Sequence, residues 1–264
     1  MRTLELREIT RRFGGVLALD RISFSVERGS IVGLIGPNGA GKTTLFNCVN
    51  GLLRPQAGEI RFFSGGAGRS VGDSLVGLPP DQVARFGIAR TFQNVRLFAN
   101  LSVLDNVTAG TYVRTRSGLL EALCPWGSGA RQEQRWSQDR ALRLLEQVGL
   151  DRCADQKAGA LSYGQQRAVE LARALASDPE LLLLDEPAAG LTLSERQQLM
   201  GLLRRLQGQG LTILLIEHDM RFVMPICDRV VVLDYGEKIA EGAPKEVQES
   251  PKVIEAYLGA EPQR

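Results

Sequence analysis

The sequence predicts an α/β fold in which a parallel β-sheet carries helices on both faces. Helix and strand patterns alternate along residues 165–217, and the strands at 181–185 and 212–217 are continuous apolar runs. Such runs are typical of parallel strands that are covered on both faces. A glycine-rich turn also links a strand at 31–35 to a helix at 43–50, as in nucleotide-binding α/β proteins.

Strand patterns dominate the first 63 residues. Residues 3–9 and 22–27 read as short alternating strands, and residues 58–63 have the composition of another strand. We expect these segments to form an N-terminal antiparallel β subdomain beside the main sheet. Residues 64–80 are rich in Gly, Ser and Pro, which predicts a loop.

In the middle of the chain, the apolar residues recur with the period of a helix rather than that of a strand. Residues 102–148 show helical spacing, which indicates an inserted helical subdomain between two α/β stretches. A further strand at 230–234 and short helices within 244–258 complete the pattern. The expected division is a discontinuous core of residues 1–93 and 165–240, a helical subdomain of residues 94–164, and a helical C-terminal tail of residues 241–264.

The composition is that of an ordinary globular protein. Of the 264 residues, 44% are hydrophobic and 23% are charged, and the formal net charge is +2. So small a charge gives no reason to expect nucleic acid as a partner. The longest apolar runs have the length of core strands, whereas a membrane-spanning helix needs about 20 apolar residues. Any role at a membrane is therefore expected to depend on partner chains.

The strongest motif follows the strand at 31–35 and has the form G-x-x-x-x-G-K-[ST], the P-loop. Its glycines let successive backbone amides point at phosphates, and the helix that follows favours an anion at its N-terminus. Lys42 is expected to reach the β and γ phosphates, and Thr43 to ligate Mg²⁺. The flanking strand and helix argue against an accidental glycine-rich turn. The residues expected to contact ATP are Gly36, Pro37, Asn38, Gly39, Ala40, Gly41, Lys42, Thr43 and Thr44.

Two carboxylates, Asp185 and Glu186, end the apolar strand at 181–185. Ligand sites in open parallel sheets lie at the carboxyl ends of the strands. Asp185 is therefore expected to hold Mg²⁺, and Glu186 to act as the general base that orients the attacking water. The alternative is a helix N-cap pair before Pro187, which the nearby P-loop disfavours. Together with the P-loop, this pair predicts a P-loop NTPase core of the RecA-like type.

His218 is the only histidine, and a lone histidine is more often structural than catalytic. Here it directly follows the apolar strand at 212–217, which places it at the same sheet edge as the phosphates. An imidazole at that place can contact the γ phosphate and the water. We therefore expect His218 to take part in hydrolysis.

A second phosphate-binding end is predicted at residues 161–166, which we call the signature motif. Its sequence, Leu-Ser-Tyr-Gly-Gln-Gln, resembles the LSGGQ signature of ATP-binding cassette (ABC) ATPases, with Tyr163 in place of the first glycine. Ser162, Gly164 and Gln165 open a helix whose hydroxyl and backbone amides can bind phosphate. One chain cannot bring this motif and its own P-loop to one phosphate. The resemblance therefore implies a head-to-tail dimer in which each ATP lies between two subunits.

The resemblance carries over to three other places. Phe13 stands where the family has an aromatic residue that stacks on adenine, and the alternative is an aromatic of the core or sheet edge. Gln93 matches the glutamine that enters the Mg²⁺ and water site and links it to the helical subdomain. Residues 189–192 match the segment that touches the opposing subunit. Thr192 replaces the usual Asp or Asn there, which leaves the coupling across the dimer open.

A finer resemblance covers nearly the whole chain. Segments 90–98, 185–191, 216–220 and 253–259 look like those of the ATPases of branched-chain amino acid importers. This resemblance implies two polytopic permease subunits, a second ATPase (a copy or a related chain), an external solute-binding protein reached indirectly, and a place on the cytoplasmic face of the inner membrane. Urea and short-amide importers have similar ATPases.

Two other classes of function compete with the transporter motor. A soluble ABC ATPase acting on ribosomes or DNA usually carries two cassettes or long coiled coils, and this chain shows neither. A scaffold that binds nucleotide without turnover is disfavoured because Glu186 and His218 are both present. The sequence thus favours an ATP-hydrolysing subunit of an importer.

Overall fold

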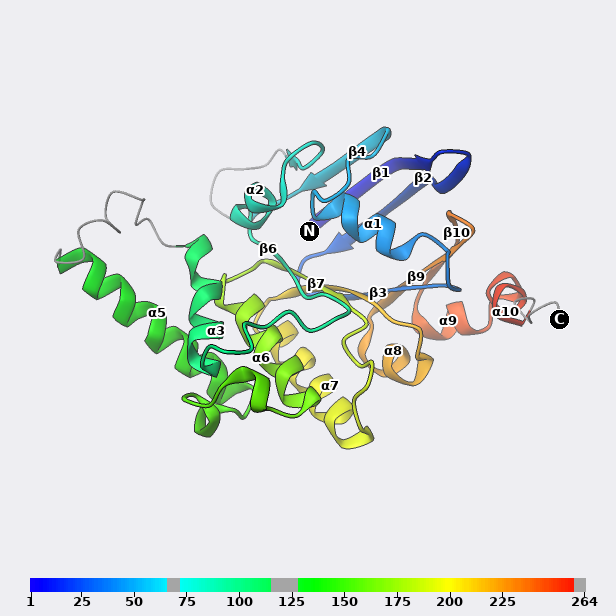
Figure 1. Cartoon of the computed structure of the whole chain (residues 1–264). Coiled ribbons are helices and arrows are strands. Elements are labelled where there is room, and N and C mark those ends of the chain that lie inside the picture. The colour runs from blue at the N-terminus through cyan, green and yellow to red at the C-terminus, as the bar shows by residue number, and fades with distance from the viewer. Residues whose placement is uncertain (66–71, 115–127, 259–264) are drawn as a thin grey trace.

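The computed structural model of the chain describes residues 1–65, 72–114 and 128–258 and contains two β-sheets (Figure 1). The smaller sheet is antiparallel and has the strand order β2-β1-β4-β5. Its first two strands form a hairpin and are longer than the sequence predicted. Its strands are β1 (Arg2–Phe13), β2 (Val16–Glu27), β4 (Ala57–Phe62) and β5 (Asp73–Ser74).

The larger sheet has the strand order β10-β9-β3-β8-β7-β6. Its neighbours are parallel except for β10, which pairs with β9 in the antiparallel sense. The expected antiparallel subdomain and parallel sheet are therefore confirmed. The strands are β3 (Ile31–Ile35), β6 (Ile88–Arg90), β7 (Leu181–Asp185), β8 (Thr212–Ile216), β9 (Arg229–Asp234) and β10 (Glu237–Gly242).

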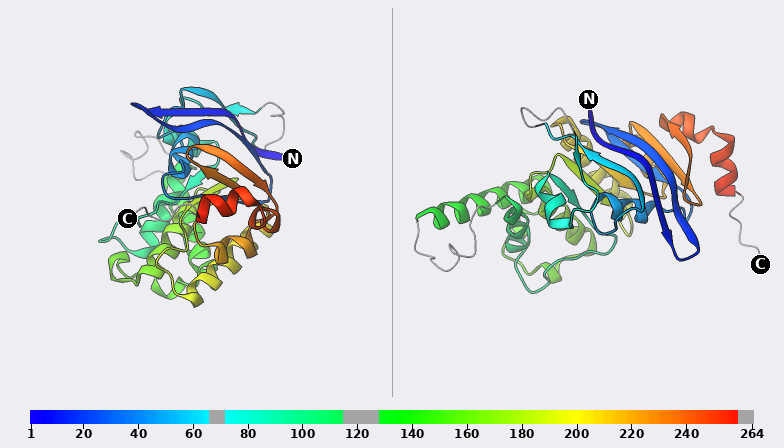
Figure 2. Two further views of the ribbon diagram at one scale, coloured as in Figure 1. Left: turned by 90° about the vertical axis from the view of Figure 1, so that its right-hand side faces the viewer. Right: turned by 90° about the horizontal axis from the view of Figure 1, so that it is seen from above.

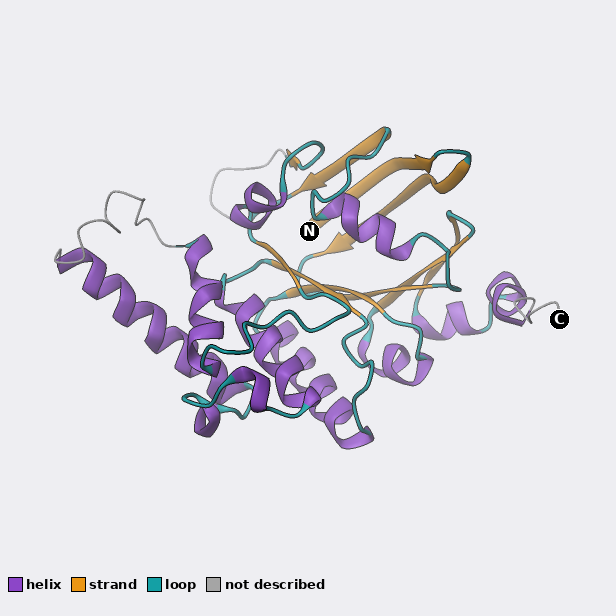
Figure 3. Cartoon of the chain, viewed as in Figure 1, coloured by secondary structure: helices purple, strands orange, loops and turns teal. Residues whose placement is uncertain are grey.

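Two hydrophobic cores lie on the two faces of the larger sheet. Along β3, the side chains of Ile31 and Ile35 join the core under the helices, whereas those of Val32 and Leu34 join the core shared with the smaller sheet. This alternation follows from the two-residue period of a strand. Helix α1 (Lys42–Val49) lies between the two sheets, so the turn that begins it is held by both (Figures 1 and 3).

Helix α2 (Pro80–Arg85) lies on the same face as α1 and contributes Val83 to that core, whereas the remaining helices cover the opposite face of the larger sheet or extend from its ends. Helix α5 projects at one end of the molecule, and α9 and α10 lie at the other (Figure 1 and the right-hand view of Figure 2). Besides α1, the helices of the described residues are α2 (Pro80–Arg85), α3 (Val103–Ala109), α5 (Ser128–Gln147), α6 (Tyr163–Ala176), α7 (Leu193–Gly208), α8 (Met220–Ile226), α9 (Pro244–Gln248), α10 (Pro251–Leu258) and the short 3-10 helices Gly110–Val113, Asp151–Cys153 and Ala158–Ala160.

Two predicted boundaries fall inside regular elements. The boundary between residues 164 and 165 lies within α6, which packs against α3 and α5. The boundary between residues 240 and 241 lies within β10, a strand whose partly exposed charged residues gave no strand pattern. Parts of the expected loop at 64–80 and of the helical segment at 102–148 lie outside the described residues. The division into subdomains stays a prediction.

Candidate functional site

The P-loop, residues 36–43, joins β3 to α1 at the carboxyl edge of the parallel strands. Gly36 and Gly41 have φ values of 148° and 100°, which residues with side chains rarely adopt. A Cβ on Gly36 would overlap the carbonyl oxygen of Leu233, and a Cβ on Gly41 would overlap that of Ala18. Both positions therefore require glycine, and the loop is held against β9 and β2. Between them lie Pro37, Asn38, Gly39 and Ala40.

The Lys42 side chain lies inside this loop and is 8% exposed. Its Nζ donates hydrogen bonds to the carbonyl oxygens of Gly36 at 2.7 Å and Pro37 at 2.8 Å. Burial lowers the pKa of Lys42, and the nearby carboxylates of Glu186 and Asp185 act in the opposite direction. The ammonium is thus held by two backbone carbonyl groups of the loop.

Asp185 ends β7 and is almost fully buried. Its Oδ2 accepts a hydrogen bond from Arg90 Nη2 at 2.9 Å, and Arg90 Nη1 donates to Asn47 Oδ1 at 2.7 Å. This pairing compensates the burial of both charges. In the first turn of α1, Thr43 is exposed and Thr44 is half-buried.

Glu186 has a φ of 48°, a left-handed conformation that is uncommon for a residue with a side chain. Its backbone amide donates to Ile216 O at 3.0 Å, so pairing with β8 holds it there. Its Oε2 accepts a hydrogen bond from Gln93 Nε2 at 3.0 Å, and its Oε1 lies 3.9 Å from Nδ1 of His218. Backbone strain of this kind, about 1–3 kcal/mol, clusters at functional sites. The structure therefore brings the three predicted catalytic side chains together.

The signature motif begins α6. Ser162 is its N-cap, and a capping box joins Ser162 to Gln165 through hydrogen bonds of 3.3 and 3.0 Å. A Cβ on Gly164 would overlap the Glu195 carboxylate, so this helix start packs on α7. Within the described residues, Ser162, Gly164 and Gln165 make no hydrogen bond to residues 36–44.

Phe13 ends β1 at the tip of the β1–β2 hairpin and is 44% exposed. The Arg11 guanidinium lies 4.7 Å from the centroid of its ring. The exposed ring remains accessible to a stacking partner, and its contact with adenine stays a prediction.

Thr192 is the N-cap of α7. Its hydroxyl accepts a hydrogen bond from the Glu195 amide at 3.3 Å and lies 2.8 Å from Glu195 Oε2. Threonine therefore serves the local capping role that Asp or Asn would serve at this position.

Two residues of the site received no role in the sequence analysis. Arg90 pairs with Asp185, which is 95 residues further along the chain, and no local pattern marks such a partner. Glu217 is buried and accepts hydrogen bonds from the amides of Ala188 at 2.8 Å and His218 at 3.2 Å. Burial raises the pKa of Glu217. The only sequence signal for Glu217 is its place at the end of an apolar strand.

The donor set at this edge fits a nucleotide with Mg²⁺. Gly39 faces open space at the loop, and Lys42 already binds acceptor oxygens there. Asp185, Thr43 and Gln93 offer oxygen ligands, which Mg²⁺ prefers. Among the described residues, no cluster of three His, Cys, Asp or Glu side chains could hold a metal by itself.

The fold and the site together define an ATP-binding cassette: a P-loop beside a carboxylate pair, with a capped signature helix in a helical layer. Across the described ranges 1–65, 72–114 and 128–258, no helix is long and apolar enough to cross a membrane. Residues 19–189 match the family model described as ABC transporter, and residues 237–262 match that described as branched-chain amino acid ATP-binding cassette transporter.

Curated relatives cover almost the entire chain. The high-affinity branched-chain amino acid transport ATP-binding proteins BraF of Pseudomonas aeruginosa and LivG of Salmonella typhimurium are 42% and 43% identical over 257 residues, which is 97% of this chain and of each relative. A probable LivG of Methanocaldococcus jannaschii is 33% identical over 263 residues, or 98% of each chain.

Solved structures agree with these matches. The ADP conformation of MJ1267, an ATP-binding cassette of an ABC transporter, superposes with a TM-score of 0.83 at 33% identity and covers 98% of this chain and 99% of its own. The dimeric cassette MJ0796 superposes with a TM-score of 0.75 at 27% identity, covering 91% and 98%. The chain belongs to the ABC transporter family, among the ATP-binding proteins of branched-chain amino acid transport.

Proposed function

We propose that this chain binds ATP with Mg²⁺ and hydrolyses it to drive the import of branched-chain amino acids. The observation that carries the hydrolytic part is the placement of Glu186. Its carboxylate is near enough to Lys42 of the P-loop to oppose the lowering of that lysine's pKa by burial, accepts a hydrogen bond from Gln93 and lies 3.9 Å from His218. The branched-chain solute is supported by the relatives BraF and LivG, whose names state that transport.

The roles proposed for the residues combine the geometry of the site with the motifs and the family resemblance. Lys42 and the loop amides bind the phosphates, and the Phe13 ring stacks on the adenine. Asp185, Thr43 and Gln93 hold Mg²⁺, which offsets charge on the phosphate oxygens.

The remaining roles concern the reaction with water. Glu186 accepts a proton from the attacking water, and His218 orients the γ phosphate and that water. Gln93 already donates to Glu186 at 3.0 Å and so connects the metal ligands to the base.

The ATP-binding site is completed by a second subunit. Ser162, Gly164 and Gln165 form a capped helix start that makes no hydrogen bond to the P-loop of its own chain within the described residues. In a head-to-tail dimer with a copy or a related ATPase, they contact the phosphates of the ATP that the other chain holds. The dimeric arrangement of the similar cassette MJ0796 supports this assembly. ATP then favours the closed dimer, and hydrolysis reopens it.

The complete machine contains two polytopic permease subunits and, on the outer side, a solute-binding protein. The chain lies at the cytoplasmic face of the inner membrane, held there by the permeases.

Affinity purification of the tagged chain from detergent-solubilised membranes tests this assembly. We expect two permease chains and a second ATPase to co-purify and to be identified by mass. Recovery of ribosomal or DNA-repair proteins without a permease would overturn the transport function and leave the ATPase assignment standing.

A further inference from the structure

Arg167 connects the signature helix to the segment that carries Gln93. It lies on α6 and is 7% exposed. Its Nη1 donates to the carbonyl oxygen of Phe92 at 2.7 Å, and its Nη2 donates to that of Gln93. A guanidinium is the side chain best suited to this task, because its fixed fork of donors can serve several acceptors at once.

Tyr163 holds the other side of this guanidinium. Its hydroxyl accepts a hydrogen bond from Arg167 Nε at 3.1 Å, and its ring lies 5.4 Å from the guanidinium carbon. The ring also covers Gly190, where a Cβ would lie 2.8 Å from Tyr163 Cε1. Gly190 belongs to the loop that follows Glu186. Tyr163 therefore contacts both that loop and Arg167, the side chain that binds the backbone of Gln93.

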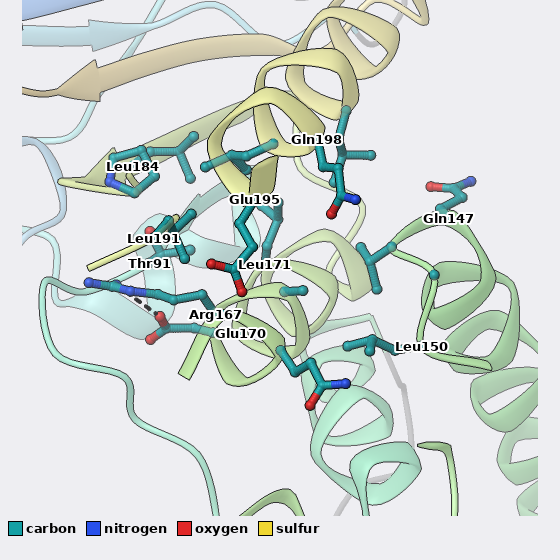
Figure 4. A pocket seen from close by; sticks show the side chains of 18 of the residues that line it. Thr91, Gln147, Leu150, Arg167, Glu170, Leu171, Leu184, Leu191, Glu195 and Gln198 are labelled. Atoms are coloured by element: carbon teal, nitrogen blue, oxygen red, sulfur yellow. Dashed lines mark ion pairs between the residues drawn. The ribbon is translucent and has the colours of Figure 1, made fainter. Parts of the chain in front are cut away.

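Glu170 compensates the charge of the Arg167 guanidinium. It is 2% exposed, lies 3.5 Å from Arg167 and accepts a hydrogen bond from the Arg96 amide at 3.3 Å. Burial raises the pKa of Glu170. Both residues of this ion pair lie on α6, and their hydrogen bonds reach residues 92, 93 and 96. The pair borders a cavity of about 510 Å³ (Figure 4).

The cavity lies between α6 and α7, and its lining includes Glu195 and Gln198 of α7 (Figure 4). Packing between these helices is therefore incomplete on this side. Arg167 connects α6 to the backbone of Phe92 and Gln93 by hydrogen bonds.

We propose that Tyr163 and Arg167 are a positioning pair that sets the place of Gln93 relative to Glu186. Tyr163 of the signature motif accepts a hydrogen bond from Arg167, which donates to the backbone of Gln93. The Gln93 side chain in turn donates to the catalytic carboxylate of Glu186 in the same chain. The inference rests on the proposed function. In a head-to-tail dimer, the signature motif touches the ATP of the opposing chain, so the pair connects that contact to the hydrolysis of its own ATP. Tyr163, which departs from the LSGGQ pattern, then has a role that glycine cannot fill.

The test uses two conservative substitutions in the purified full-length chain, Tyr163→Phe and Arg167→Lys. Tyr163→Phe removes one hydroxyl acceptor, and we expect kcat for ATP to fall about threefold to tenfold, as one lost hydrogen bond implies. Lysine cannot donate to both carbonyls and Tyr163 in the fork geometry, so Arg167→Lys is expected to lower kcat by about tenfold or more. KM for ATP stays within about twofold in both, because neither residue contacts the nucleotide of its own P-loop.

Arg173→Lys is the matched control. Arg173 lies on the same helix and approaches Glu170 at 4.0 Å, and the structure shows it making no hydrogen bond to residues 92–93 in the described chain. Its kcat is expected to stay within about twofold of wild type. Melting temperatures show that each variant is folded.

A double-mutant cycle with Gln93→Ala separates positioning from general stability. If the pair acts through Gln93, Tyr163→Phe has no further effect on kcat in the Gln93→Ala background. An equal loss of kcat in both backgrounds, or wild-type kcat in Tyr163→Phe, overturns the inference. Wild type and Glu186→Gln are measured in parallel. If Glu186→Gln loses turnover while Tyr163→Phe and Arg167→Lys keep it, the proposed function is supported and only the inference about the pair is contradicted.

Discussion

Replacing Lys42 by alanine is expected to lower the affinity for ATP by about 100-fold or more. Hydrogen bonds to a charged group contribute about 1.5–3 kcal/mol, and the ammonium is placed to serve two phosphates at once. In the present structure the same ammonium satisfies the carbonyl oxygens of Gly36 and Pro37. The substitution therefore also removes two bonds that hold the loop, and a small decrease in the melting temperature is expected. Titration calorimetry with ATP and Mg²⁺ measures the affinity.

Lys238→Ala is the matched control for Lys42→Ala. Lys238 also donates to a backbone carbonyl, that of Ser23 at 2.6 Å, but it lies on β10. Its loss is expected to leave the ATP affinity within about twofold of wild type. An unchanged affinity in Lys42→Ala itself contradicts the P-loop assignment.

Much of the core could be predicted from the sequence because its signals are local. A buried parallel strand has a continuous apolar run, and the P-loop is a contiguous motif between a strand and a helix. The same locality predicted Asp185, Glu186 and His218 at one sheet edge, since each lies at or just beyond the carboxyl end of a strand. The antiparallel subdomain was predicted from alternation, although its first two strands are longer than expected.

What the sequence did not predict depends on contacts between distant segments. Arg90 pairs with Asp185, and Arg167 reaches the carbonyl oxygen of Phe92, yet neither partner is near in sequence. β6 has only three residues, so its period cannot be recognised. The left-handed backbone of Glu186 is fixed by pairing to β8 rather than by the residue type.

Glu186→Gln is expected to lower kcat for ATP hydrolysis by about 100-fold or more while ATP binding is retained. A positioned general base contributes about 10²–10⁴-fold, and the neutral amide cannot accept the proton. Glutamine keeps the size of the side chain, so the position of Gln93 and the backbone at residue 186 are preserved. Gel filtration with ATP is expected to show an accumulated ATP-bound dimer, since reopening needs hydrolysis.

Glu180→Gln provides the comparison for Glu186→Gln. Glu180 directly precedes β7 and accepts hydrogen bonds from Ser64 and Gly65, so it stands at the opposite end of the same strand. Its substitution is expected to preserve kcat within about twofold. Hydrolysis by Glu186→Gln at the wild-type rate would show that another group is the base.

Uptake of labelled leucine tests the central claim most directly. Cells that lack this chain are supplied with wild type or Glu186→Gln, and the initial rate of leucine entry is measured with valine, isoleucine, urea or acetamide as competitors. We expect that wild type restores uptake, that Glu186→Gln does not, and that only valine and isoleucine compete. Uptake that is equally fast without the chain or with Glu186→Gln, or that urea or acetamide suppresses, would contradict the proposed import of branched-chain amino acids.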